Sequence, residues 1–261
     1  MKRPGLIHLL TRGFLGLFVY VYLLPVQAAQ PLVVAAASDL RYAMNRLVSQ
    51  YRILHPQDIL HMVYGSSGKF RAQIANGAPF DLFFSADISY PEMLQKQGLT
   101  ASKVYPYALG RIALWSATRA ADRLKLRDLV AEDIKKIAIA NPLHAPYGQR
   151  AKEALQQVGI WEKVKPKLVY GENISHTAQL VASGAADIGI IALSLAVSPE
   201  LRQLGGYSLI PERLHKPLLQ GFVITRHGGD RPEAKRFAAF IRSAAGHKTL
   251  ASYGFSLPAV K

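Results

Sequence analysis

Short apolar segments alternate with amphipathic segments along the chain, and this alternation constrains the fold more than any other feature. In the first part, segments with the length of buried strands occur at 31–37, 59–64 and 81–86. Segments with helical spacing follow them at 38–54, 67–77 and 88–98. Strands that alternate with helices are typical of an α/β domain with a mostly parallel sheet.

The same pattern begins again near residue 110. Strands are expected at 110–117, 134–141, 167–171, 186–193, 207–211 and 218–225, and helices at 147–159, 174–184 and 231–254. A chain of 261 residues is long enough for one large domain or two of medium size. Because the alternating pattern occurs twice, we expect two α/β lobes packed face to face.

The N-terminus has the layout of a secretory signal peptide. Basic residues precede an apolar run over 13–25, and Val26 and Ala28 occupy the two small-residue positions of a cleavage site. The uncharged run over 13–29 is shorter than the roughly 20 residues that a membrane span needs. We therefore expect cleavage near Ala28 and export to the bacterial periplasm, with 1–28 as the signal peptide.

Composition limits the possible partners and chemistry. The chain has no cysteine, which excludes a disulfide framework and thiolate chemistry. The net charge is +15, and it falls to +12 when the signal peptide removes three basic residues and no acid. A basic surface attracts anions. The basic residues are scattered rather than clustered, so we expect no nucleic-acid partner.

Four junctions share one pattern, in which an apolar strand is followed by a loop and a helix start. They lie at Ser38, Ser67, Tyr147 and Ile174. A helix N-terminus offers unpaired N–H groups and the positive end of the helix dipole, so it can bind an anion without a charged side chain. One junction alone is ordinary capping. Four together predict a cleft that binds a small oxyanion from both sides.

The segment YGSSGKF, residues 64–70, could be interpreted in other ways. A phosphate-binding P-loop needs Ser or Thr after the lysine, and here Phe70 follows Lys69. The Gly-x-Ser-x-Gly pattern of a hydrolase is one residue too long for this segment. A hydrolase that uses Ser67 or Ser38 as nucleophile is the second hypothesis, and it needs a base within hydrogen-bond reach. The histidine and aspartate residues show no metal-ligand spacing, so no cation site is expected.

Several segments together resemble the molybdate-binding proteins of ABC importers, the ModA-like family. The resemblance is carried by VVAAASDL, YGSSGKFRAQIANGAPFDLFFSAD, NPLHAPYGQRAKEALQQVGIW and KLVYGENISHTAQLVASGAADIGIIALS. It implies the two-lobed periplasmic binding protein fold of type II, with mostly parallel sheets and one crossed-back strand per lobe. The implied lobes are residues 31–107 plus 218–261, and residues 108–217.

The resemblance also implies a function and a set of binding residues. The protein would be no enzyme and would hold no cofactor. It would bind molybdate and tungstate as a monomer and deliver them to the inner-membrane permease of an ABC transporter. Ser38 and Ser67 would each contribute a hydroxyl and an N–H group, and Tyr147 and Ile174 would each contribute a backbone N–H group.

One position departs from the family pattern. Well-known members carry a tyrosine at the place of Ala192, and its hydroxyl reaches the ligand. Tyr147 either supplies the missing hydroxyl from the other side or only packs over the cleft. A sulfate or phosphate carrier on the same fold is the alternative function. A pocket made only of donors disfavours partly protonated phosphate, and size disfavours sulfate, but neither separates molybdate from tungstate.

Overall fold

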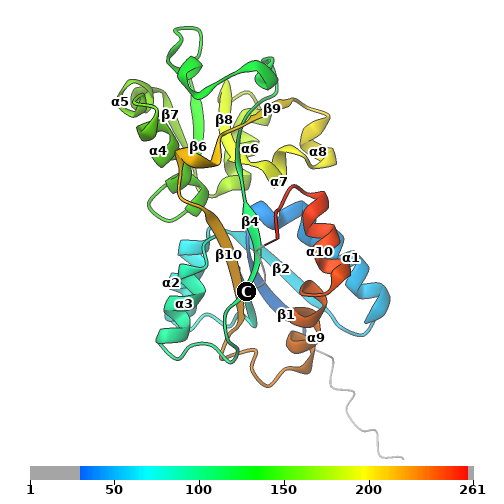
Figure 1. Cartoon of the computed structure of the whole chain (residues 1–261). Helices are drawn as coiled ribbons and strands as arrows, with labels where there is room; N and C mark the ends of the chain where they lie inside the picture. The colour runs from blue at the N-terminus through cyan, green and yellow to red at the C-terminus, as the bar shows by residue number, and fades with distance from the viewer. Residues whose placement is uncertain (1–29, 258–261) are drawn as a thin grey trace, which may run out of the picture.

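The protein has two lobes, each built on a five-stranded sheet with helices packed around it (Figure 1). The computed structural model describes residues 30–257, so the predicted signal peptide lies outside the described residues. Across residues 30–257, every helix is too short or too polar to cross a membrane.

The two sheets have matching topologies. The strand order in the first sheet is β2-β1-β3-β10-β4 and in the second β7-β6-β8-β5-β9. Their bounds are β1 Leu32–Ala37, β2 Leu60–Gly65, β3 Leu82–Ser85, β4 Tyr105–Gly110, β5 Ile112–Ser116, β6 Ile137–Ala140, β7 Leu168–Gly171, β8 Ile188–Ala192, β9 Gly206–Leu209 and β10 Leu218–Ile224. In each sheet one strand runs antiparallel to both neighbours, β10 in the first and β5 in the second. This arrangement confirms the predicted fold class.

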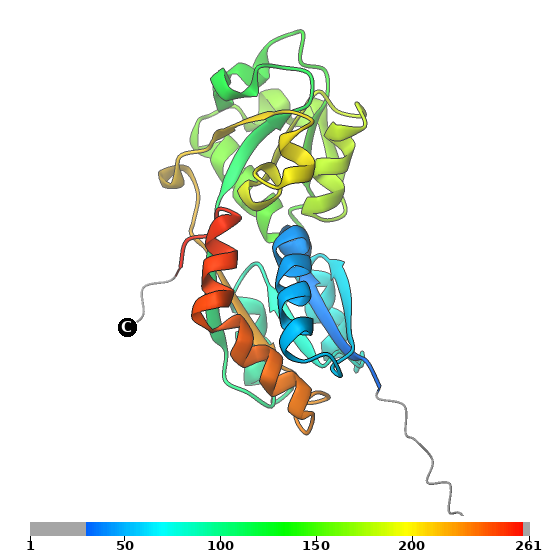
Figure 2. The same ribbon diagram turned by 90° about the vertical axis from the view of Figure 1, so that its right-hand side faces the viewer.

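The helices lie on both faces of the sheets. Their bounds are α1 Arg41–Leu54, α2 Ser67–Ala75, α3 Ser89–Lys96, α4 Pro146–Gln157, α5 Trp161–Val164, α6 Ile174–Ala182, α7 Leu193–Ala196, α8 Pro199–Arg202, α9 Pro232–Ile241 and α10 Ala244–Ser252. A short 3₁₀ turn, Ser38–Leu40, connects β1 to α1. Figure 2 shows α1, α9 and α10 together on one side of the first lobe.

Successive side chains of the central strands alternate between the two faces of the first sheet, and apolar side chains cover both faces. Val34 and Phe84 pack on the side of α1, α9 and α10, whereas Ala35 and Phe83 pack on the side of α2 and α3. Successive strand residues point to opposite faces, so a strand covered on both sides reads as a continuous apolar run. The packing holds the carboxyl ends of β1 and β2, and the loops after them, at the edge that faces the second lobe.

The chain passes between the sheets twice (Figure 1). Strand β4 leads directly into β5, and the chain returns from β9 to β10. Strand β4 was not predicted, because Pro106 weakens its strand pattern; it lies at a sheet edge, where proline is tolerated. In the first sheet β4 pairs with β10 as far as Gly110.

The predicted bounds of the lobes, residues 31–107 with 218–261 and residues 108–217, stay a prediction.

A single C-terminal helix was predicted over 231–254, but the structure has two helices there, α9 and α10. The side chain of Ser243 accepts a hydrogen bond from the N–H of Gly246 at 3.2 Å and so caps the start of α10. Serine is a favoured N-cap residue. The interruption changes the direction of the chain, so that both α9 and α10 pack against α1.

Candidate functional site

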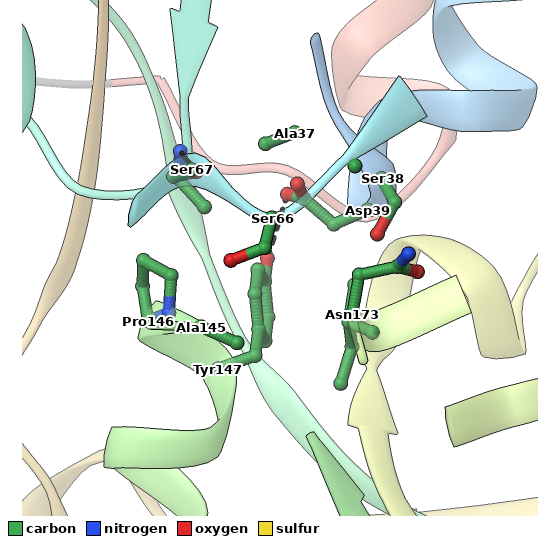
Figure 3. A pocket seen from close by; sticks show the side chains of 12 residues that line it. Ala37, Ser38, Asp39, Ser66, Ser67, Ala145, Pro146, Tyr147 and Asn173 are labelled. Atoms are coloured by element: carbon green, nitrogen blue, oxygen red, sulfur yellow. Dashed lines mark hydrogen bonds between the residues drawn. The ribbon is translucent and has the colours of Figure 1, made fainter. Parts of the chain in front are cut away.

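A small cavity lies between the lobes, where strand ends meet helix starts (Figure 3). The space between its lining atoms, including the part open to solvent, is about 200 Å³. Its lining includes the four residues singled out from the sequence, which are Ser38, Ser67, Tyr147 and Ile174. The structure thus brings them together from both lobes, although they are far apart in the chain.

The first lobe contributes two buried serines. Ser38 begins the turn after β1, and its Oγ accepts the N–H of Ser175 at 3.2 Å. Ser67 is the first residue of α2, and its Oγ accepts the N–H of Ala86 at 3.0 Å. A hydroxyl that accepts one hydrogen bond still has a proton to donate. Both serines can therefore act as donors to a ligand in the cavity.

The second lobe contributes two helix starts. Tyr147 is the second residue of α4, after Pro146 in the first position, and Ile174 is the first residue of α6. Backbone N–H groups in the first turn have no acceptor within their own helix. The side chain of Asn173 caps α6 by accepting the N–H of His176 at 3.0 Å, and Asn173 also lines the cavity. This side of the cavity offers backbone donors and positive helix ends.

The hydroxyl of Tyr147 is committed to a buried network. It donates to Oδ2 of Asp39 at 3.0 Å and accepts a hydrogen bond from Nε2 of Gln220 at 3.0 Å. Figure 3 shows the ring rising from α4 toward Asp39. The hydroxyl proton is therefore engaged, and the ring is buried rather than lying over the cleft mouth. Ala192, at the end of β8, is also fully buried.

Asp39 is the residue that the sequence analysis missed. Its side chain lines the cavity next to Ser38, and Oδ2 accepts hydrogen bonds from Tyr147 and from Gln220, the latter at 2.7 Å. Oδ1 is buried and has no hydrogen-bond partner. Burial raises the pKa of this carboxyl from 3.8 to about 6, although Gln220, Tyr147 and nearby backbone N–H groups lower it in part. The sequence predicted a cavity lined only by hydrogen-bond donors. That prediction is wrong, because the carboxyl group of Asp39 also lines the cavity.

The signal that could have identified Asp39 is its position. It lies two residues after a fully apolar strand, and the carboxyl ends of parallel strands are where ligands bind in α/β sheets. The residue next to it, Ser38, was chosen on the same argument. A charged side chain at such a position is costly to bury, so it points to a role.

The cavity has no positively charged side chain among the described residues that line it. Residues 30–257 also contain no group of three or more His, Cys, Asp or Glu that could hold a metal ion. In the same residues, the hydrogen bonds of the Ser38 and Ser67 hydroxyls are to backbone N–H groups. Neither hydroxyl has a basic side chain as a hydrogen-bond partner, which leaves the hydrolase hypothesis without its base.

Hydrogen bonds and an ion pair cross the cleft beside the cavity. The carbonyl oxygen of His144 accepts hydrogen bonds from Oγ of Ser66 at 2.5 Å and from the N–H of Gly68 at 3.0 Å. On the surface, Lys69 pairs with Glu172 at 2.8 Å. These contacts join the start of α2 in the first lobe to loops of the second lobe. The lobes are thus in contact on the α2 side of the cavity.

Comparisons with known proteins agree with this architecture. A family model described as bacterial extracellular solute-binding protein matches residues 32–256. The molybdate-binding protein ModA of Rhodobacter capsulatus is 36% identical over 197 residues, which are 74% of this chain and 75% of that protein. ModA of Azotobacter vinelandii is 35% identical over 228 residues, which are 86% of this chain and 89% of that protein.

A solved structure is similar as well. The periplasmic molybdate-binding protein of Azotobacter vinelandii superimposes with a TM-score of 0.82 at 30% sequence identity. The match covers 87% of this chain and 99% of that protein. The similarity therefore includes both lobes.

Proposed function

This chain belongs to the family of bacterial extracellular solute-binding proteins, as a ModA-like member, and from that premise we propose that it binds molybdate for uptake by an ABC transporter. The observation that carries the proposal is the cavity between the lobes, where buried hydroxyls and helix starts converge and no lining residue among those described is Lys or Arg. Such a cavity suits a small anion that is recognised by hydrogen bonds.

The binding residues that we propose are Ser38, Ser67, Tyr147 and Ile174. The two serines donate through their hydroxyl groups, and Tyr147 and Ile174 donate through backbone N–H groups at helix starts. Each hydrogen bond to a charged acceptor contributes about 1.5–3 kcal/mol. Each helix start adds about 0.3–1 kcal/mol, and more in a buried geometry. Several such contacts are enough for tight binding of a doubly charged oxyanion.

The selectivity that we propose follows from the size and charge of the ligand. Tungstate is nearly the same size as molybdate and carries the same charge, so both bind with similar affinity. Sulfate is smaller, and hydrogen bonds set for the larger ion are stretched when they reach it. Phosphate is partly protonated near neutral pH, and a protonated oxygen repels a donor.

The proposed setting is the periplasm. The signal peptide is removed near Ala28, and the mature protein, a monomer, delivers its ligand to an inner-membrane permease. It carries out no chemical reaction and needs no cofactor. The two lobes are residues 31–107 with 218–261, and residues 108–217.

The test is calorimetry of the purified mature protein with molybdate, tungstate, sulfate and phosphate. We expect one-to-one binding of molybdate and tungstate, far tighter than binding of sulfate. Tight binding of sulfate or phosphate together with no heat from molybdate would contradict the proposal and favour a carrier for another oxyanion.

A further inference from the structure

The wall of the proposed oxyanion site contains a carboxyl group, which creates an electrostatic conflict. Among the described residues that line the cavity, Asp39 is the only Asp or Glu. Molybdate carries two negative charges, and an ionised carboxylate beside it would repel it strongly, because little water screens charges in a buried site. Either the carboxyl group or the ligand must therefore carry a proton.

The hydrogen bonds of Asp39 fit a neutral acid. Oδ2 accepts two hydrogen bonds, from Tyr147 and Gln220, and so it acts as the carbonyl oxygen of an acid would. Oδ1 is shielded from solvent and has no partner with hydrogen-bond geometry; the N–H groups of Asp39 and Leu40 lie near the carboxyl group and stabilise its charge only in part, since burial still raises its pKa. A buried carboxylate normally has partners for both oxygens. A proton on Oδ1 removes the uncompensated charge from the oxygen that has no partner.

The surrounding elements supply no charge that would keep the carboxyl group ionised. Tyr147 of α4 and Tyr107 of β4 face it, and burial raises the pKa of both phenols well above their usual range, so both are neutral. From α1, the guanidinium of Arg41 lies over the ring of Tyr64, 5.0 Å from its centroid. From α6, the imidazole of His176 accepts a backbone N–H at its own helix start. Helix α7 contains no titratable residue.

We propose that Asp39 couples binding of the oxyanion to uptake of one proton, because a fully deprotonated oxyanion enters the cavity only when Asp39 is the neutral acid with its proton on Oδ1. The inference rests on the proposed function. Without ligand, the pKa of Asp39 is about 6 because the group is buried. A dianion beside it favours the protonated form and raises this pKa further. The proton comes from solvent when the ligand binds and returns to solvent when it leaves.

The pH dependence follows with a definite sign. Above the pKa of Asp39 in the free protein, Asp39 must take up a proton from solvent each time a ligand binds, so affinity falls as pH rises. One proton corresponds to about a tenfold loss of affinity for each pH unit. Protonation of molybdate itself would weaken binding at low pH, which is the opposite direction. The two effects can therefore be separated by the sign of the slope.

The experiment is calorimetry with molybdate between about pH 5 and about pH 9, a range that brackets the pKa of Asp39. At each pH, two buffers with different ionisation enthalpies report the number of protons taken up. For the wild-type protein we expect uptake approaching one proton per molybdate at pH 7 to 8, with the tenfold slope. For Asp39→Asn, which keeps an oxygen acceptor for Tyr147 and Gln220, we expect no uptake, a flat profile and tighter binding than wild type at high pH.

A second variant tests the same inference if Asp39→Asn folds poorly. The hydrogen bond from Tyr147 lowers the pKa of Asp39. Tyr147→Phe removes that bond but keeps the ring and the backbone N–H group. The steep part of the affinity profile should then begin at a higher pH than in the wild-type protein. A loss of affinity that is equal at every pH would show a structural role only and would contradict the inference.

The outcomes distinguish the inference from the proposed function. Molybdate binding that is independent of pH and takes up no proton would overturn the inference and leave the function intact. No molybdate binding by any variant at any pH would overturn the function. If monohydrogen phosphate binds the wild-type protein tightly and molybdate binds only Asp39→Asn, then Asp39 is an ionised acceptor for a protonated oxyanion, and the inference is wrong.

Discussion

Ser38 and Ser67 each accept a backbone N–H with a hydroxyl oxygen, which orients the hydroxyl and leaves its proton for a ligand. Ser67 also stands at the first position of α2, so its own N–H group has no acceptor within the helix. A single residue at a helix start can therefore donate twice to one anion. Because one residue can donate two hydrogen bonds, a cavity without a lysine or arginine side chain can still suit a doubly charged ligand.

Ser67→Ala should weaken molybdate binding by one to two orders of magnitude, because it removes one charge-assisted donor worth about 1.5–3 kcal/mol. It also leaves the buried N–H of Ala86 without its acceptor, so some stability is lost as well. Calorimetry and thermal unfolding measure the two effects. Ser49→Ala is the control, since Ser49 is exposed on α1 and bonds only within its helix. Equal affinities for both variants would contradict a ligand contact by Ser67.

Asp39 should also make folding depend on pH. Burial raises the pKa of its carboxyl group from 3.8 to about 6, so between these values the folded protein binds more protons than the unfolded chain. The free energy of unfolding therefore falls as pH rises through this window and is constant above it. The loss is about 3 kcal/mol for a shift of this size.

The measurement is urea unfolding of the wild-type protein and Asp39→Asn, without ligand, at steps from about pH 4 to about pH 7. The difference in free energy of unfolding between the two proteins should change across the window in favour of the variant. All other titrating groups are shared, so the difference isolates Asp39. A constant difference would mean that the carboxyl group keeps its ordinary pKa.

At the scale of secondary-structure elements, the start of α6 combines capping with ligand binding. The amide oxygen of Asn173 accepts the N–H of His176, and the same side chain lines the cavity. Asn173→Ala should lower the free energy of unfolding by about 1 kcal/mol, because the cap is lost. Chemical denaturation measures this loss.

Two further substitutions at this position separate the cap from the charge of the site. Asn173→Asp keeps an oxygen that can cap the helix, but it places a negative charge beside the anion and should weaken binding at least tenfold. Asn173→Ser keeps a cap without charge and serves as the matched control. If Asn173→Asp bound molybdate as tightly as Asn173→Ser, the cavity would not be the anion site.

Local sequence patterns were enough to predict most of the strands and helices and the four junctions that meet at the cavity. Strand β4 was missed because Pro106 interrupts its apolar pattern, and the break before α10 was missed because helical spacing continues through Ser243. The role of Asp39 could not be predicted from local pattern. Its burial and its unequal oxygens depend on Gln220, which lies 181 residues away in the sequence.

At the scale of the whole molecule, the two lobes meet through contacts that any opening of the cleft must break. The pair Lys69–Glu172 is exposed on both sides, so it is screened by water and contributes little. The contact between Gly68 and His144 joins backbone to backbone at 3.0 Å and leaves no room for a side chain. A Cβ added at Gly68 would lie 2.5 Å from the carbonyl oxygen of His144 and 3.1 Å from its Cα. Glycine at this position is therefore a requirement of lobe contact and not of the helix.

Gly68→Ala should separate ligand affinity from stability for this reason. Within α2, alanine is favoured over glycine by about 1 kcal/mol, so the first lobe loses nothing. The clash arises only when the lobes meet, and we expect the lobes of the ligand-free variant to separate and relieve it. Molybdate affinity should therefore fall at least tenfold, while the melting temperature without ligand stays the same or rises. Small-angle X-ray scattering with saturating molybdate should give a larger radius of gyration for the variant than for the wild-type protein. The control is Gly206→Ala, whose added Cβ would meet other atoms only at 3.8 Å and beyond. Unchanged affinity and unchanged scattering for Gly68→Ala would show that ligand binding does not require the lobes to meet at His144.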